Sequence, residues 1–119
     1  MSDRWRTRID KSPSSTIDKL IDDATRLLVE AVHPEKIILF GFHARGDSTK
    51  DSDLDFLVIL STVEDTFEEM MRLERILLSL LVPVDVLVYS ADDVRERAHL
   101  RGTVLYHALT EGKVLHDAA

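Results

Sequence analysis

The sequence predicts a single α/β domain with a small mixed β-sheet and helices packed on one side of it. Short apolar runs at 36–41, 54–60 and 84–89 have the length and composition of buried strands. Longer segments of helical periodicity flank and separate these runs, which is the alternation expected of an α/β fold. The 119 residues are 45% hydrophobic and 31% charged, which suits one ordinary globular domain.

The first helix is predicted to start at Ser14 or Ser15 and to end before Pro34. A serine at the start and a proline beyond the end are typical helix boundaries. Its apolar stripe comprises Ile17, Leu20, Ile21, Ala24, Leu27, Leu28 and Ala31. Residues 1–13 lack such periodicity, so we expect a flexible N-terminal segment ahead of a domain at 14–119.

A second long helix is predicted at about 63–81, after the polar pair Ser61 and Thr62. Its apolar positions are broad enough to be mostly buried, with the two methionines as core filler: Phe67, Met70, Met71, Leu73, Ile76, Leu77 and Leu80.

Beyond the third strand, Ser90 is the expected N-cap of another helix. Gly102 interrupts that helical region before a further helical segment at 103–111. A final extended piece is expected at 113–115.

Composition excludes several classes of function. Fifteen basic and 22 acidic residues give a net charge of −7, which argues against nucleic acid as a direct partner. The absence of cysteine excludes disulfides and thiolate metal sites. No paired metal-ligand spacing occurs among the five histidines. We expect a cytoplasmic protein with no membrane partner, because neither a signal peptide nor a membrane-spanning run is apparent.

The stretch from Gly41 to Val58 carries the chemistry. Asp53 and Asp55 are two residues apart in a predicted strand, so their carboxylates point to one face and repel each other. A divalent cation such as Mg²⁺ would relieve this repulsion, since it takes carboxylate and phosphate oxygens as ligands. Gly41 allows close approach of a ligand to the backbone, and amides at the start of a following helix would favour phosphate. Together these features predict a nucleoside triphosphate site.

The spacing of this stretch resembles the nucleotidyltransferase signature of the DNA polymerase beta superfamily, a Gly-Ser pair, ten residues and then Asp-x-Asp. Here Gly41 and Phe42 are followed by ten residues, 43–52, and then by Asp53-Leu54-Asp55. Ala44-Arg45-Gly46 and the run from Ser52 to Asp55 resemble the minimal nucleotidyltransferases in particular. The resemblance extends over nearly the whole chain and implies the nucleotidyltransferase fold.

The resemblance also implies roles for individual residues. Asp53, Asp55 and a third acid, Asp85, would be catalytic and would hold two Mg²⁺ ions, with ATP as substrate. Asp85 would join the ion beside the attacking hydroxyl and could accept its proton. Taken by itself, Asp85 in an apolar strand has a second interpretation, a solvent-facing position on an edge strand.

Nucleotide binding is assigned to Gly41, Phe42, Arg45 and Gly46, and Lys50 is a further candidate to contact phosphate. Phe42 departs from the family, which has serine there. A phenyl ring cannot donate the lost hydrogen bond, which is worth about 1.5–3 kcal/mol when the acceptor is charged. Backbone amides are unaffected by the change.

The resemblance implies an adenylyltransferase, the antitoxin that transfers AMP to a HEPN-type toxin encoded nearby. A second hypothesis is a binding module with a weakened or inactive site, in which Phe42 marks the loss and contact alone neutralises the partner. The acidic triad favours the enzyme, and Phe42 favours the binding module. Transfer to a small molecule is a third hypothesis and the least favoured. Base preference, acceptor and homo- or hetero-oligomeric state are left open by the sequence.

Overall fold

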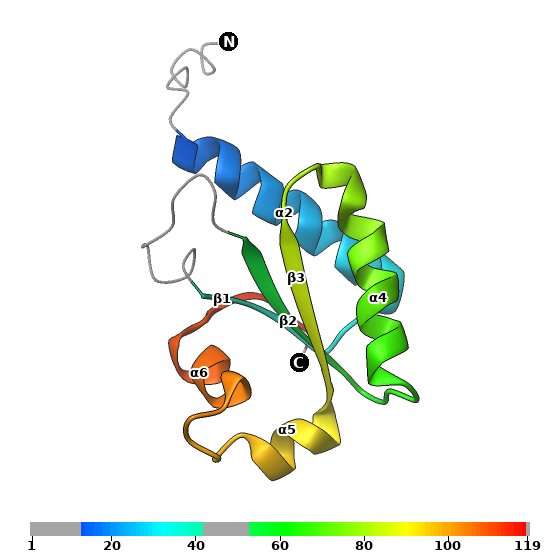
Figure 1. The fold of residues 1–119 in the computed structure, drawn as a ribbon, viewed down its shortest axis with the longest axis vertical. Helices are drawn as coiled ribbons and strands as arrows, with labels where there is room; N and C mark the ends of the chain where they lie inside the picture. The colour runs from blue at the N-terminus through cyan, green and yellow to red at the C-terminus, as the bar shows by residue number, and fades with distance from the viewer. Residues whose placement is uncertain (1–12, 42–52, 119) are drawn as a thin grey trace.

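The computed structural model describes residues 13–41 and 53–118. The chain forms α2 (Pro13–Val32), β1 (Lys36–Phe40), β2 (Leu54–Leu60), α4 (Thr66–Ile76), the 3-10 helix η1 (Leu77–Leu80), β3 (Val84–Ser90), α5 (Ala91–Arg97), α6 (Val104–Glu111) and β4 (Lys113–Asp117), as Figure 1 shows. All three predicted strands are present. The predicted flexible segment lies almost entirely outside the described residues, so its boundary with the domain stays a prediction. No helix in 13–41 or 53–118 is long and apolar enough to cross a membrane.

The four strands form one mixed sheet in the order β3-β2-β1-β4. β2 and β3 are parallel, whereas β1 is antiparallel to both β2 and β4. The predicted α/β class and mixed sheet are therefore confirmed. β4 pairs with β1 at the edge of the sheet. It contains the segment at 113–115 that the sequence predicted only as an extended piece.

The predicted placement of all helices on one side of the sheet needs correction. Helices α2 and α4 cover one face, where their side chains join Phe56, Val58 and Val86 in the larger apolar cluster. On the opposite face, Leu105 and Ala108 of α6 pack with the smaller cluster of Ile38, Leu57 and Ile59, and Val94 of α5 adjoins it. The burial of β2 explains why helices lie on both faces. Every residue of this strand except Asp55 is buried, so both faces of the strand must be covered.

The second long helix is shorter and less buried than predicted. α4 begins after Asp65, whose carboxylate accepts the backbone N–H of Glu68 at 3.1 Å. Leu73 is buried as expected, but Phe67 is 67% exposed and Met71 is 42% exposed. The apolar stripe is wider than the strip of α4 that contacts the sheet, so part of it faces solvent.

The other helix boundaries agree with the sequence. The Ser90 hydroxyl accepts the backbone N–H of Asp93 at 3.0 Å, which confirms the predicted N-cap of α5. Gly102, at φ 86°, separates α5 from α6. A Cβ on Gly112 would overlap the Ala108 carbonyl oxygen and the Ile38 side chain. Glycine therefore lets the end of α6 lie close against β1.

Candidate functional site

Two of the predicted catalytic aspartates are direct neighbours across the parallel strands. Asp55 of β2 pairs with Asp85 of β3 in register. Paired residues of adjacent strands point to the same face, and the next residues on that face, Leu57 and Leu87, belong to the α6-side cluster. Both carboxylates thus lie on the face that α6 partly covers. The opposite face carries Leu54, Phe56 and Val58, as predicted.

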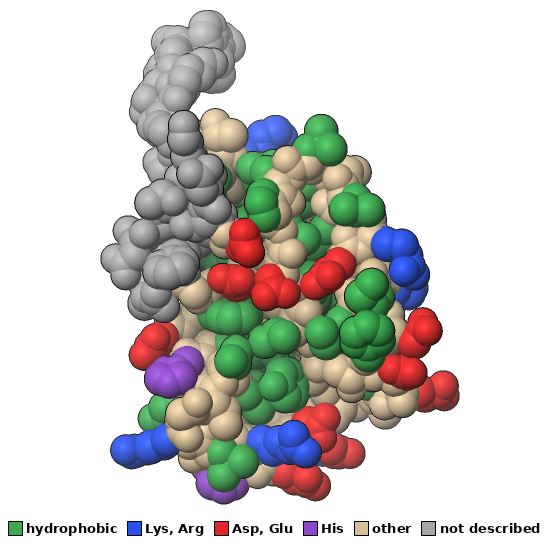
Figure 2. Space-filling view, in the orientation of Figure 1, with side chains coloured by type: hydrophobic (Ala, Val, Ile, Leu, Met, Phe, Trp, Pro, Cys, Tyr) green, Lys and Arg blue, Asp and Glu red, His purple; other side chains and the backbone are tan. Residues whose placement is uncertain are grey.

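Asp53 completes the acidic group on this side of the sheet. It immediately precedes β2 and lies two residues before Asp55, so strand alternation directs both to the same face. Asp53 and Asp85 are exposed, and Asp55 is half-buried. Figure 2 shows acidic side chains gathered across the middle of the molecule, above a patch of apolar side chains.

A fourth carboxylate, on Glu74 of α4, lies at the outer edge of β3. It accepts the backbone N–H of Val86, the residue after Asp85, at 3.2 Å. β3 is an edge strand, and this bond satisfies one of the edge N–H groups left without a strand partner. The sequence contains no local signal for this contact, because it joins residues from two elements.

Gly41 lies directly against the side chain of Asp55. It follows β1 at φ 78°, a conformation that favours glycine, and its neighbour Phe40 pairs in register with Asp55. A Cβ on Gly41 would overlap Oδ2 of Asp55. Only a residue without a side chain brings the end of β1 this close to the carboxylate, and the predicted close approach of a ligand to Gly41 stays a prediction.

The carboxylates of Asp53, Asp55 and Asp85 are chemically suited to Mg²⁺, since carboxylate oxygens are the ligands that this ion prefers. Within the described ranges, no group of three or more His, Cys, Asp or Glu side chains is already arranged around a common metal position. Mutual repulsion favours carboxylates that point apart when no cation lies between them. The backbone places Asp53, Asp55 and Asp85 on one face, and side-chain rotation would have to complete a shared site. Their role as metal ligands stays a prediction.

The remaining predicted nucleotide contacts are Phe42, Arg45, Gly46 and Lys50. All four lie in 42–52, outside the part of the chain that the structure describes.

A small cavity adjoins the candidate site on the α6 side. It measures about 210 Å³ and is lined by Phe40, Gly41, Gly102, Val104, His107 and Glu111. Nδ1 of His107 lies 3.6 Å from Oε2 of Glu111, one turn along α6. Sequence reasoning did not identify this cavity, because it forms only where α6 packs back toward the end of β1.

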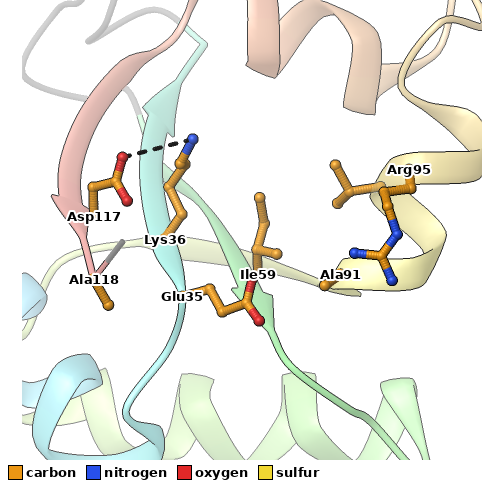
Figure 3. A pocket seen from close by; sticks show the side chains of 8 residues that line it. Glu35, Lys36, Ile59, Ala91, Arg95, Asp117 and Ala118 are labelled. Carbon is orange, nitrogen blue, oxygen red and sulfur yellow. Dashed lines mark ion pairs between the residues drawn. The ribbon is translucent and has the colours of Figure 1, made fainter.

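A larger cavity of about 400 Å³ lies at the opposite end of the sheet (Figure 3). Ile59 and Lys36, which line it, pair in register four positions from the Asp55 and Phe40 pair. Nζ of Lys36 forms an ion pair with Oδ2 of Asp117 at 3.8 Å. Oε2 of Glu35 accepts a hydrogen bond from the Ser61 hydroxyl at 2.9 Å. Its charged groups therefore have protein partners, and its location separates it from the catalytic aspartates.

Comparison with solved structures shows a similar fold in one proposed nucleotidyltransferase and in two toxin–antitoxin structures. A proposed nucleotidyltransferase from Sulfolobus solfataricus has a TM-score of 0.59 and 18% identity, covering 84% of this chain and 79% of its own. A toxin–antitoxin structure with AMP-PNP has a TM-score of 0.58 and 21% identity, with 81% and 73% covered. A mutant of the toxin–antitoxin MntA-HpeT has a TM-score of 0.51 and 20% identity, with 89% and 74% covered. No curated protein matches the sequence.

The family comparison is more specific than these distant structural likenesses. Residues 23–118 match the family described as polymerase beta, nucleotidyltransferase. The matched region includes β1, β2 and β3, and with them Gly41 and the three aspartates. This chain belongs to the polymerase beta nucleotidyltransferase family.

Proposed function

We propose that this protein is a Mg²⁺-dependent nucleotidyltransferase that transfers AMP from ATP to a partner protein, as the antitoxin of a toxin–antitoxin pair. The observation that carries the proposal is the placement of Gly41 against Asp55 and of Asp55 in register with Asp85. This arrangement gathers negative charge at the end of β1, where metal ions would bind the phosphates of a nucleotide. Family membership supports transfer of a nucleotide as the reaction class.

Each aspartate has a distinct task in this proposal. Asp53 and Asp55 would hold the metal ions against the triphosphate, and Asp85 would orient the acceptor hydroxyl and accept its proton. The hydroxyl oxygen bonds to the α-phosphorus while the bond from that phosphorus to the pyrophosphate oxygen breaks. Two Mg²⁺ ions, when bound, would make the hydroxyl more acidic and offset charge on the departing pyrophosphate.

The choice of partner and nucleotide rests on the toxin–antitoxin neighbours. One of them contains AMP-PNP, an ATP analogue. The other carries two Asp-to-Glu changes separated by one residue, the spacing of Asp53 and Asp55 in this chain. These likenesses favour a toxin as acceptor, and we propose a HEPN-type protein encoded by a neighbouring gene, with both proteins in the cytoplasm.

Contact inhibition is the competing function. Phe42 favours it, because the side chain at this position cannot donate a hydrogen bond to the triphosphate. In that case the protein would neutralise the toxin by binding alone, and the aspartates would make no contribution.

Phe42→Ser distinguishes the two functions. A restored hydroxyl should raise ATP affinity by roughly tenfold or more, the value of one hydrogen bond to a charged group, and transfer should rise with it. The measurement incubates wild type and variant with labelled ATP, Mg²⁺ and the protein encoded by the adjacent reading frame, and follows label on that protein. If both forms bind it tightly and neither labels it, contact inhibition is the correct function.

A further inference from the structure

We propose that the cavity between the end of β1 and α6 binds the base of the nucleotide, with Glu111 accepting a hydrogen bond from it. This inference rests on the proposed function, because it assigns a second part of the same substrate to a separate group of residues. The cavity is bounded by Phe40, Gly41, Gly102, Val104, His107 and Glu111.

Gly41 connects the cavity to the acidic site. The same residue lines the cavity and lies so close to Asp55 that a Cβ would overlap its carboxylate. A triphosphate held beside Asp55 therefore has the cavity mouth next to it, on the same face of the sheet. Figure 1 shows α6 beside this end of the sheet. The larger cavity near Lys36 has no such connection, because it lies at the other end of the strands.

The walls of the cavity suit a flat aromatic ring. Phe40 is half-buried and provides an aromatic surface, and Val104, in the first turn of α6, also lines the cavity. Gly102 has open space where a side chain would lie, whereas the corresponding space at Gly41 holds the Asp55 carboxylate. Ligand sites commonly combine such apolar walls with a few polar groups that fix orientation.

The polar groups of the cavity come from one face of α6. His107 and Glu111 are four residues apart and each is about half exposed, at 54% and 53%. An ionised carboxylate only accepts hydrogen bonds, so Glu111 would accept one from an exocyclic amino group. Adenine carries such an amino group, so Glu111 would hold the base of ATP at the cavity.

Val104→Trp tests whether the cavity is occupied. Val104 is 50% exposed, so a larger side chain can enter the cavity without disturbing the core. Val114→Trp is the matched control, since Val114 is 53% exposed and lies on β4, outside the cavity. Calorimetry with Mg²⁺·ATP and with Mg²⁺·tripolyphosphate, which lacks the base, should show wild type binding ATP at least about tenfold more tightly, the value of one stacked base. Val104→Trp should remove that advantage and leave tripolyphosphate binding unchanged.

Three kinds of result would overturn the base site. Equal affinity of wild type for ATP and tripolyphosphate, or an unchanged ATP advantage in Val104→Trp, overturns the base site and leaves the proposed function standing. Failure of wild type to bind either compound overturns both. A Val104→Trp effect that Val114→Trp reproduces would also overturn it, because the effect would then not depend on the cavity.

Glu111→Ala tests the hydrogen bond to the base. Alanine removes the acceptor of the adenine amino group, so ATP affinity should fall by about tenfold or more, the value of one hydrogen bond to a charged group, while tripolyphosphate affinity should not fall. Glu30→Ala, an exposed position on α2, removes the same charge on the opposite face and should leave both affinities unchanged. An unaltered ATP affinity in Glu111→Ala would refute the role of this carboxylate.

Discussion

Asp85→Asn is expected to slow AMP transfer to the partner by roughly 10²–10⁴-fold, the usual contribution of a positioned general base. Asparagine has nearly the same shape as aspartate but cannot accept a proton from the acceptor hydroxyl. Asp85 is exposed on the edge strand β3, so the substitution should leave the fold intact. The measurement is the rate of label transfer from ATP to the partner at saturating Mg²⁺.

Asp22→Asn is the matched control for that experiment. Asp22 is exposed on α2, which packs on the other face of the sheet, so this variant should transfer AMP at the wild-type rate. If Asp85→Asn is as fast as wild type, Asp85 is simply a solvent-facing residue on an edge strand, the interpretation that the sequence left open.

Gly41→Ala should impair both stability and activity. The residue has φ 78°, where a side chain costs about 1–2 kcal/mol, and the added methyl group would overlap the Asp55 carboxylate. Displacement of Asp55 by about 1 Å would lower transfer about 10²-fold, as expected for misplaced catalytic groups. Urea unfolding measures the stability, and label transfer measures the activity.

Gly102→Ala separates the conformational cost of a side chain at positive φ from the cost of the overlap with Asp55. Gly102 has a similar φ of 86°, but a Cβ there meets nothing within 4 Å. This variant should show only the conformational cost in its free energy of unfolding. If Gly41→Ala is no less stable than Gly102→Ala and transfers AMP normally, the close fit of Gly41 to Asp55 has no functional importance.

The strands and the acidic residues could be predicted from the sequence, because both signals are local. Apolar runs marked β1, β2 and β3, and the spacing of Asp53 and Asp55 placed two carboxylates on one face. The pairing of Asp55 with Asp85 could not be predicted from spacing alone. It depends on the parallel register of β2 and β3, two strands that are separated in the chain by α4 and η1.

The positions of helices relative to the sheet were less predictable. Phe67 and Met71 share the helical periodicity of buried residues, but periodicity does not say how wide a strip of α4 contacts the sheet. The cavity beside Gly41 depends on α6 crossing to the other face, where Gly112 allows close packing against β1. Nothing in the local sequence around His107 and Glu111 specifies that crossing.

The most direct test of the central claim is calorimetry of ATP binding with Mg²⁺ and with a chelator, in wild type and in the double variant Asp53→Ala, Asp55→Ala. Urea unfolding of both proteins establishes that the double variant is folded, so that a loss of binding reports on the site itself. The account predicts that ATP binds wild type only with Mg²⁺, and that the double variant does not bind it. Equal ATP affinity with chelator present, or in the double variant, would contradict a metal-dependent nucleotide site at these aspartates.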